Sequence, residues 1–331
     1  MRTTIVIPCK NGHDTLKMCL DSIARLDYPG GFDLILIDDG STDDTPQIMQ
    51  EFKKAHGNIE TTILKGGGKL GAGNAINMGW KASRSDLIAV TNADCVVFKD
   101  WLAQILKPFQ DPTVGGATGD VLTPKEDMNL LQRLIGYELE FRYSNYPKYV
   151  LSPQDSNLAY RRKVLEEVGG YDTQFKTGYD VDIGYRVNQA GYKIEFNPKA
   201  KVWHHHRAGL ISYWRQQIQT SKSRFQILMK HPHGIRGDNL ANPTLMITPP
   251  LIWILLAGLL PSLIIPTMVV PYAFLCLFYL ALMLNYTLRI FRKFPKPETL
   301  LLFPLMIYRS MALGWGMFQG IVLVGRNKLL P

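Results

Sequence analysis

Four apolar segments recur in the first hundred residues of the chain. They are Thr3–Pro8, Asp33–Asp39, Thr61–Lys65 and Asp86–Asp94. Their runs of Val, Ile and Leu are nearly continuous, which is typical of strands covered on both faces of a sheet. Two of the intervals between them, His13–Leu26 and Asp43–Ala55, have the apolar spacing of helices. This alternation predicts right-handed βαβ units and a doubly wound, mostly parallel α/β sheet.

The pattern changes beyond residue 238. The 50 residues from Asn239 to Leu288 contain no Asp, Glu, Lys or Arg. As a helix this tract would be roughly 75 Å long at ~1.5 Å per residue, whereas the hydrocarbon core of a bilayer is about 30 Å thick. One span cannot use that length, so we predict two spans, Leu245–Ile265 and Met268–Leu288, joined by a tight hairpin.

Two flanking segments are amphipathic or mixed. Leu300–Val324 is apolar but contains Arg309, so it could span the membrane, re-enter it or lie at its surface, and we favour a span. Ala208–Lys230 has apolar residues at helical spacing among Arg and Lys, which is typical of an interfacial helix, with a surface helix as the alternative. We therefore expect three parts: an α/β domain (1–207), an interfacial or linker helix (208–238) and a membrane region with two or three transmembrane helices (239–331).

The distribution of charged residues indicates how the chain is oriented in a membrane. The 331 residues carry 37 Lys and Arg against 28 Asp and Glu, a formal net charge of +9. Basic residues flank the uncharged tract on both sides: Lys230, Arg236, Arg289, Arg292, Lys293 and Lys296. The positive-inside rule places both flanks in the cytosol. Membrane orientation accounts for the basic excess, so we expect membrane lipids as partners and no nucleic acid.

The amino-terminal residues and the cysteines indicate the same compartment. The apolar run before Lys10 is shorter than the ~7–15 residues of a signal-peptide core. Cys9, Cys19, Cys95 and Cys276 have no metal-site spacing, which favours reduced thiols. We therefore predict a multi-pass membrane protein whose α/β domain lies on the cytosolic side.

Polar residues stand beyond the carboxyl ends of the predicted strands, where ligands bind in such sheets. Asp38 and Asp39 end the second strand, and Asn92 and Asp94 end the fourth. Side chains two residues apart in an extended chain point the same way, so Asn and Asp oxygens can hold a divalent cation together with phosphates. For the first pair, a turn with a helix cap is the alternative. The glycines within residues 66–73 could admit phosphates to backbone N–H groups or form a flexible loop.

Five segments, taken in order, carry a family resemblance. They are TTIVIPCKNGHDTLKMCLDSI, LILIDDGSTDDT, NADC, NLAYRRKVLEEVGGYD and GYDVDIGYRVNQAGYKIEFNPKAKVWHHHR. As a set they resemble family-2 glycosyltransferases, inverting enzymes with a GT-A fold. The resemblance implies that residues 1–207 form a GT-A-like catalytic domain. It also implies a nucleotide pocket lined by Pro8, Asn11, Asp38 and Asp39, with an Asp of the pair reading the base.

The same resemblance assigns a metal and a base. Asn92-Ala93-Asp94 would be the D-x-D-like motif, with Asp94 on a Mg²⁺ or Mn²⁺ ion and on the diphosphate, and Asp180 would be the catalytic base. Two positions depart from the family pattern. Asn92 replaces an acid, which predicts weaker metal affinity, and Tyr179 replaces a Glu, which bears on acceptor contacts. The candidate acceptor contacts are Tyr179, Asp182 and Trp214.

Other residues offer chemistry with a structural alternative beside it. Asp180 and Asp182 could only cap the helix that follows them. In the run His204–Arg207 the first and third histidines share a face if the strand continues. His204 could then complete the metal shell and Arg207 could neutralise a diphosphate, whereas a pair of surface histidines is the alternative.

We therefore expect an inverting, metal-dependent glycosyltransferase at the cytosolic membrane face. Its donor would be a nucleotide diphosphate sugar, and its acceptor a lipid-linked molecule or a glycan, the former favoured by the membrane anchor alone. Two alternatives stay open. A processive polysaccharide synthase is disfavoured by too few spans and by Gln216–Thr220, which lacks the Arg-Trp part of a Q-x-x-R-W motif. A non-catalytic sugar-nucleotide sensor or scaffold is kept open by Asn92 and Tyr179.

Overall fold

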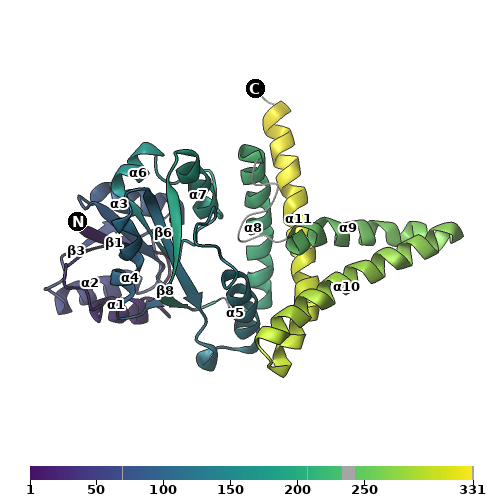
Figure 1. Cartoon of the computed structure of the whole chain (residues 1–331), viewed down its shortest axis with the longest axis horizontal. Helices are drawn as coiled ribbons and strands as arrows, with labels where there is room; N and C mark the ends of the chain where they lie inside the picture. Colours follow the sequence, from purple (N-terminus) through teal and green to yellow (C-terminus); the bar gives the residue numbers. More distant parts are fainter. Residues whose placement is uncertain (69, 207, 233–242, 330–331) are drawn as a thin grey trace. The chain divides into compact units, whose positions relative to one another are not determined.

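The chain folds into two units (Figure 1). The structure, a computed structural model, describes residues 1–68, 70–206, 208–232 and 243–329. The first unit comprises Met1–Pro124 and Asn145–His206, and the second comprises Lys125–Ser144 and Arg207–Pro331. The sequence did not lead us to expect that Lys125–Ser144 would belong with the carboxyl-terminal unit. The three-part division itself stays a prediction.

One sheet forms the centre of the first unit. Its eight strands, counted over the described residues, are β1 (Thr3–Cys9), β2 (Asp33–Asp38), β3 (Thr61–Lys65), β4 (Leu87–Thr91), β5 (Cys95–Val97), β6 (Val114–Leu122), β7 (Asn157–Arg161) and β8 (Lys193–His204). In space they follow the order β3-β2-β1-β4-β7-β6-β8-β5. The first four pair in parallel, whereas β7 runs antiparallel to both of its neighbours. The predicted doubly wound, mostly parallel α/β fold is confirmed.

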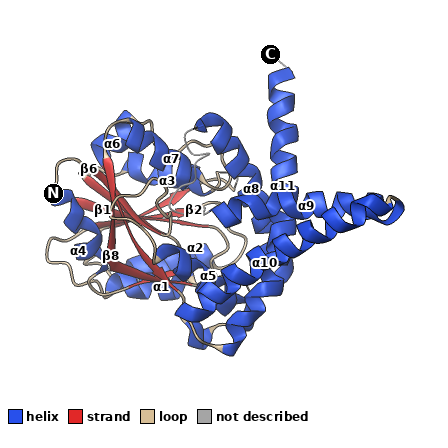
Figure 2. Cartoon of the chain, turned by 45° about the vertical axis from the view of Figure 1, so that its right-hand side comes forward, coloured by secondary structure: helices blue, strands red, loops and turns tan. Residues whose placement is uncertain are grey.

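Helices cover both faces of this sheet (Figure 2). They are α1 (Leu16–Ala24), α2 (Thr45–Ala55), α3 (Ala72–Ala82), α4 (Trp101–Leu106), α6 (Arg162–Glu167) and α7 (Tyr179–Gln189), with the 3-10 turn η1 (Lys107–Gln110). The side chains of Ile5, Ile7, Leu34 and Leu36 in the central strands are fully buried. Burial on both faces explains why these strands are apolar along nearly their whole length.

The fourth predicted strand ends earlier than expected. Strand β4 stops at Thr91, and β5 begins only at Cys95 and pairs with β8. The backbone N–H of Cys95 donates to the carbonyl of Asn92 at 3.0 Å, which closes a turn between the two strands. The predicted strand Asp86–Asp94 is therefore wrong in its last residues, because this hydrogen bond turns the chain. The polar residues of that segment lie on a turn rather than on one side of an extended strand.

The described part of the second unit is helical. Its elements are the 3-10 turns η2 (Lys125–Asp127), η4 (Pro266–Met268) and η5 (Pro297–Leu301), and the helices α5 (Leu130–Tyr143), α8 (Leu210–Lys230), α9 (Pro243–Ile264), α10 (Val269–Lys293) and α11 (Leu302–Leu329). Helix α5 begins at a capping box, in which the side chains of Asn129 and Gln132 each accept the other's backbone N–H at 3.0 Å. Its buried residues share one apolar core with α9, α10 and α11.

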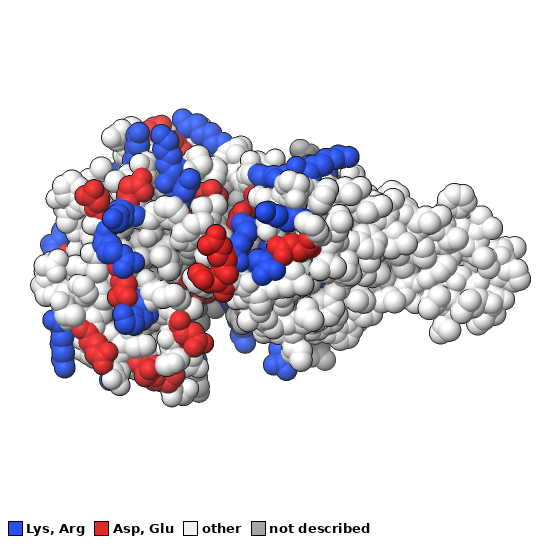
Figure 3. Space-filling model, turned by 90° about the horizontal axis from the view of Figure 1, so that it is seen from below, with Lys and Arg blue, Asp and Glu red and all other residues white. Residues whose placement is uncertain are grey.

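Three helical segments of the second unit are long and apolar enough to cross a membrane. They are Thr244–Ile264, Pro266–Lys293 and Pro297–Gly325. The first two overlap the predicted pair of spans, and the short turn η4 joins α9 to α10, in agreement with the predicted hairpin. The third contains the segment for which a span was favoured. Figure 3 shows that the far end of the α9–α10 pair carries no Lys, Arg, Asp or Glu on the visible face. These features indicate membrane association.

Candidate active site

The carboxyl ends of β1 and β2 bring the predicted nucleotide-binding residues together. The backbone N–H of Asp39 donates to the carbonyl of Cys9 at 2.9 Å, next to the half-buried Pro8. Asn11 adopts a left-handed conformation with φ of 54°, and its side-chain oxygen accepts the backbone N–H of Thr42 at 2.8 Å. The turn after β1 is thus tied directly to the turn after β2.

The two acids after β2 hold loops in place. The Asp38 carboxylate accepts the backbone N–H of Ser41 at 2.9 Å. Both carboxylate oxygens of Asp39 accept backbone N–H groups at 3.0 Å, one from Leu70 and one from Gly71, which is the N-cap of α3. Both side chains are buried, with 7% and 5% exposure. The prediction that one of them reads a base therefore stays a prediction, beside a loop-supporting role that these contacts establish.

The glycine-rich segment after β3 lies against the same turn. Gly40 has φ of 68°, and a Cβ atom on it would come within 2.5 Å of the Cα of Gly68. Only glycine fits such a close backbone approach in that conformation. Together with the hydrogen bonds to Asp39, this contact holds the described residues of the glycine segment in one arrangement. This favours a loop of defined conformation over a flexible loop.

The turn between β4 and β5 places Asp94 beside the end of β8. The Nε2 atom of His204 lies 3.4 Å from Oδ2 of Asp94, whose side chain is 42% exposed. Burial would raise the pKa of Asp94, but the charge and hydrogen bond of His204 act in the opposite direction, and the resulting pKa is below its ordinary value. Asp94 is therefore an anion at neutral pH. The structure brings the two side chains together, and the prediction that His204 completes a metal shell with Asp94 stays a prediction.

These side chains fit a divalent cation. One ligand atom each from Asp94, Cys95 and His204 lie within 4.8 Å of one another. A carboxylate oxygen and an imidazole nitrogen suit Mn²⁺ and related ions. Burial raises the pKa of the Cys95 thiol well above its usual range, so the oxygen and nitrogen are the better donors. Asn92, the other predicted ligand, adjoins this group, and its carbonyl accepts the Cys19 thiol at 3.4 Å.

His206 has a different environment from His204. Their rings contact each other, with centroids 4.6 Å apart, so the prediction that they lie on the same side agrees with the structure. His206 is buried, however, and its Nε2 atom lies 2.9 Å from the hydroxyl of Thr123. It is therefore placed to support the ring of His204 rather than to reach a ligand.

The two acids of α7 differ in how deeply they are buried. Asp182 is fully buried, and its Oδ2 atom lies 2.7 Å from Nη2 of Arg186. Arg186 also donates to the backbone carbonyls of Val168 and Gly170. This geometry favours the structural alternative for Asp182. Asp180 lies in the first turn of α7 and is partly exposed, as a base that meets a substrate must be.

The sequence analysis missed one acid, Asp155, which contacts the start of α7. The hydroxyl of Tyr179 donates a short hydrogen bond to Oδ2 of Asp155. Burial and the Asp155 charge raise the pKa of Tyr179 well above its usual range, so it stays a hydroxyl donor. Asp155 lies two residues before β7, an antiparallel strand whose amino end is at the edge where the parallel strands have their carboxyl ends. The sequence carries no local signal for this placement, because it depends on the antiparallel direction of β7.

Two predicted residues cannot be placed in this group. Arg207 lies outside the described residues. Trp214 belongs to α8 in the second unit, where its ring contacts that of Tyr308 with centroids 4.8 Å apart. Their predicted roles at a diphosphate and an acceptor stay predictions.

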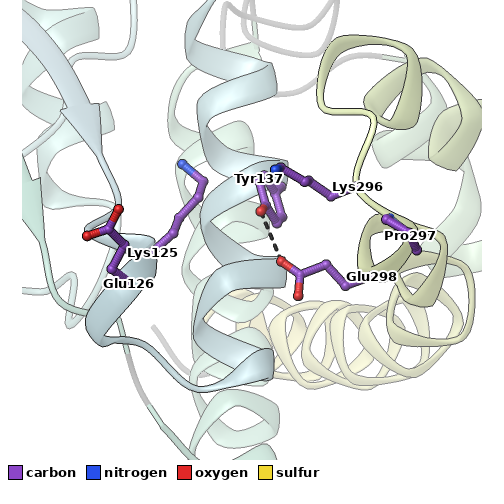
Figure 4. A pocket seen from close by; sticks show the side chains of 6 residues that line it. All are labelled: Lys125, Glu126, Tyr137, Lys296, Pro297 and Glu298. Atoms are coloured by element: carbon purple, nitrogen blue, oxygen red, sulfur yellow. Dashed lines mark hydrogen bonds between the residues drawn. The ribbon is translucent and has the colours of Figure 1, made fainter.

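The second unit contains a hollow of about 620 Å³ (Figure 4). Its lining residues are Lys125, Glu126, Tyr137, Lys296, Pro297 and Glu298. Glu298 accepts from the hydroxyl of Tyr137 at 2.9 Å and from Arg133 at 2.6 Å, and Lys125 lies 2.6 Å from Glu140. Because Lys125 and Glu298 are paired within the protein, we assign no ligand to this hollow.

Comparison with families of known proteins gives two matches. The model of glycosyl transferase family 2 matches residues 4–169, and the model of glycosyl transferase family group 2 matches residues 87–290. The first match includes the turns after β1, β2 and β4, and the second includes α7 and the end of β8.

Several curated proteins are similar in sequence. A pre-mycofactocin glycosyltransferase of Mycobacterium tuberculosis is 27% identical over 275 residues, which are 79% of this chain and 55% of that protein. A probable glycosyltransferase of Bacillus subtilis, YdaM, is 27% identical over 240 residues, 69% of this chain and 56% of that protein. A poly-β-1,6-N-acetyl-D-glucosamine synthase of Staphylococcus epidermidis is 24% identical over 238 residues, with coverages of 69% and 55%. The chain thus spans about half the length of these relatives.

Solved structures share the fold. A mannosyltransferase of Pyrobaculum calidifontis, solved with GDP-mannose and Mn²⁺, has a TM-score of 0.63 and 18% identity, and the match covers 97% of this chain and 87% of that one. Residues 1–349 of Staphylococcus aureus TarS have a TM-score of 0.52 and 15% identity, with coverages of 98% and 92%. At these identities the likeness establishes the fold alone.

Proposed function

Because the chain belongs to glycosyl transferase family 2, we propose that it is an inverting, metal-dependent glycosyltransferase with a nucleoside diphosphate sugar as donor. The observation that carries this proposal is the meeting of Asp94 and His204 at 3.4 Å, at the sheet edge where the β1 and β2 turns also lie. Solved structures with the same fold contain a nucleotide sugar or nucleotide with Mn²⁺, which supports a divalent ion here.

The proposed roles follow from position and charge. Asp94 and His204 would hold Mg²⁺ or Mn²⁺, with Asn92 as a neutral neighbour that weakens the affinity. When bound, the ion stabilises the negative charge of the departing diphosphate. The turns containing Asn11, Asp38 and Asp39 would enclose the nucleotide, and Arg207 would balance diphosphate charge.

Asp180 is the proposed catalytic base. It accepts the proton of the acceptor hydroxyl while that oxygen forms a bond to the anomeric carbon of the sugar. The bond from the same carbon to the diphosphate breaks on the opposite side, so the anomeric configuration inverts. One carboxylate suffices because no covalent intermediate is formed.

A membrane-embedded acceptor is the finer part of the proposal. It is supported by the three apolar helices of the second unit and by the basic residues that flank them, which favour a cytosolic catalytic domain. Purified protein in lipid nanodiscs should transfer sugar to polyprenyl-phosphate-linked glycans faster than to the matched soluble glycans. Transfer to the soluble glycans at an equal or higher rate than to the lipid-linked ones would contradict this part.

A processive synthase is the second candidate, favoured by the similarity to poly-N-acetylglucosamine synthases. Electrophoresis of the product separates the two: a single addition supports the first candidate, and a ladder of long chains supports the second. A non-catalytic sensor would bind nucleotide sugars without turning them over.

The primary test is a donor screen. Wild-type protein is incubated with a panel of nucleoside diphosphate sugars that includes GDP-mannose and UDP-N-acetylglucosamine, with Mn²⁺, with Mg²⁺ or with a chelator. We expect metal-dependent release of nucleoside diphosphate from at least one donor. Binding of a donor by calorimetry without any release would favour the sensor and reject the enzyme.

A further inference from the structure

Asp155 lies between the two ends of the candidate active site. Strand β7 pairs antiparallel with β4, with Asn157 opposite Thr91, and the Thr91 hydroxyl donates to the carbonyl of Ser156 at 2.9 Å. Asp155 directly precedes Ser156, so it adjoins the point where β4 ends and the turn to Asp94 begins.

On its other side, Asp155 contacts the start of α7. Its Oδ2 atom accepts the hydroxyl of Tyr179, the residue that directly precedes Asp180. Asp155 is thus connected through one turn to the proposed metal ligands and through one side chain to the proposed base. In an in-line transfer, the transferred sugar lies between the departing diphosphate and the attacking hydroxyl. A side chain between the metal end and the base end is therefore beside that sugar.

The carboxylate is held in one orientation. The Tyr179 ring is only 5% exposed and contacts the Tyr171 ring edge-to-face, with centroids 5.8 Å apart. The ring is packed on one side and bonded at its hydroxyl, so it fixes Oδ2 of Asp155. Within the described residues, no protein group donates a hydrogen bond to Oδ1, and the side chain is partly exposed. A fixed acceptor with an unfilled position suits recognition of a ligand hydroxyl.

We propose that Asp155 is a specificity-determining residue whose Oδ1 atom accepts a hydrogen bond from one hydroxyl of the transferred sugar, and that Tyr179 positions it. This inference rests on the proposed function and deepens it. A site built to bond a substrate hydroxyl discriminates strongly against an analogue that lacks it, because a buried polar group is then left unpaired.

The test uses deoxy analogues of the donor that the wild type turns over in the screen above. For that nucleotide sugar, kcat/KM is measured with the parent and with each monodeoxy derivative, for wild type, Asp155→Ala and Tyr179→Phe. We expect one deoxy position at which the wild type loses at least about tenfold in kcat/KM. At that position the loss disappears in Asp155→Ala, and Tyr179→Phe gives an intermediate loss. Ratios within one variant are independent of the fraction that is folded.

Tyr171→Phe is the matched control. Its hydroxyl is buried and has no hydrogen-bond partner in the described part of the chain, and its ring belongs to the same aromatic group. It should retain the wild-type pattern of deoxy losses. If every deoxy loss is the same in wild type and Asp155→Ala, the inference is overturned while the proposed function stands. If the wild type releases no nucleoside diphosphate from any donor, the proposed function is rejected and the inference with it.

Discussion

Two groups of charged side chains in this molecule differ in how completely they are paired. In the second unit, Glu138 is 2% exposed and accepts from the hydroxyl of Tyr286 at 2.9 Å, from Arg309 at 2.8 Å and from Arg142 at 3.0 Å. In the first unit, Asp94 is 42% exposed and has His204 as a neighbour at 3.4 Å. The first group is closed around its own charges, whereas the second is open to a ligand.

The difference separates a structural role from a chemical one. Burial would raise the pKa of Glu138, but the charges of Arg142 and Arg309 outweigh this effect, and the resulting pKa is below its ordinary value. This carboxylate therefore stays ionised inside the unit. A buried carboxylate with three donors has no capacity for a substrate, and it ties α5 to α10 and α11. A half-buried carboxylate beside an imidazole keeps that capacity. Mutations in the two groups should therefore affect different observables.

The largest effect is expected for Asp180→Asn. Removing a general base lowers the rate by about 10²–10⁴-fold, because the acceptor proton no longer has a carboxylate to accept it. Initial rates of nucleoside diphosphate release measure the effect, and thermal unfolding should be nearly unchanged. Asp182→Asn is the matched control: it disrupts the ion pair with Arg186, so it should lower the melting temperature while the rate per folded molecule changes little. The reverse pattern would exchange the roles of the two acids.

Glu138→Gln should act on stability alone. Breaking a buried ion pair by removing one partner costs about 3–5 kcal/mol, because the remaining charges stay buried without compensation. Denaturant or thermal unfolding of protein in nanodiscs measures the loss. Lys17→Ala, which removes an exposed pair with Asp21 at 2.9 Å, should change the unfolding free energy by about 1 kcal/mol or less. Equal effects of the two changes would show that the buried Glu138 group contributes no more to stability than an exposed ion pair.

His204→Ala should change metal dependence more than fold. Loss of an imidazole donor beside Asp94 is expected to raise the half-saturating Mn²⁺ concentration by at least about tenfold. Titration of the rate with Mn²⁺, together with calorimetry of Mn²⁺ binding, measures the shift. His205→Ala removes a neighbouring histidine that is not part of the Asp94–Cys95–His204 group, and it should titrate like the wild type. A wild-type metal response in His204→Ala would show that the ion is held elsewhere.

The smallest effect concerns pH. Because the folded pKa of Glu138 is below its ordinary value of 4.5, its contribution to stability is fully present above pH 4.5 and is lost as the pH falls through the folded pKa. The unfolding free energy of the wild type should thus decline on acidification below pH 4.5. In Glu138→Gln this decline should be shallower, since the titrating group is gone. Parallel declines in both proteins would assign the acid sensitivity to other carboxylates.

The sequence predicted the sheet because local patterns determine it, and the roles of the candidate site residues stay predictions. Continuous apolar runs identified β1 to β3, and the rule for parallel strands placed Asp38, Asp39 and Asp94 at one edge. Asp155 was missed because that rule considers carboxyl ends, whereas β7 is antiparallel and contributes its amino end to the same edge. Antiparallel pairing of residues 66 positions apart, such as Thr91 and Asn157, leaves no local pattern to find.

In the second unit, too, the sequence predicted the elements but not their long-range contacts. The uncharged tract identified α9 and α10 from composition alone. Helix α5 packs in that unit through its apolar core and through the contact of Glu138 with Arg309, which are 171 residues apart. An isolated amphipathic segment does not reveal which distant surface its polar residues will meet.

The central claim is that a single carboxylate and a metal ion carry out one in-line displacement. The most direct test is the anomeric configuration of the product, read from the proton NMR coupling of the transferred sugar and compared with that of the donor. The account predicts inversion in every product molecule. Retention of configuration would contradict it, because a single displacement from the face opposite the diphosphate always inverts the anomeric carbon.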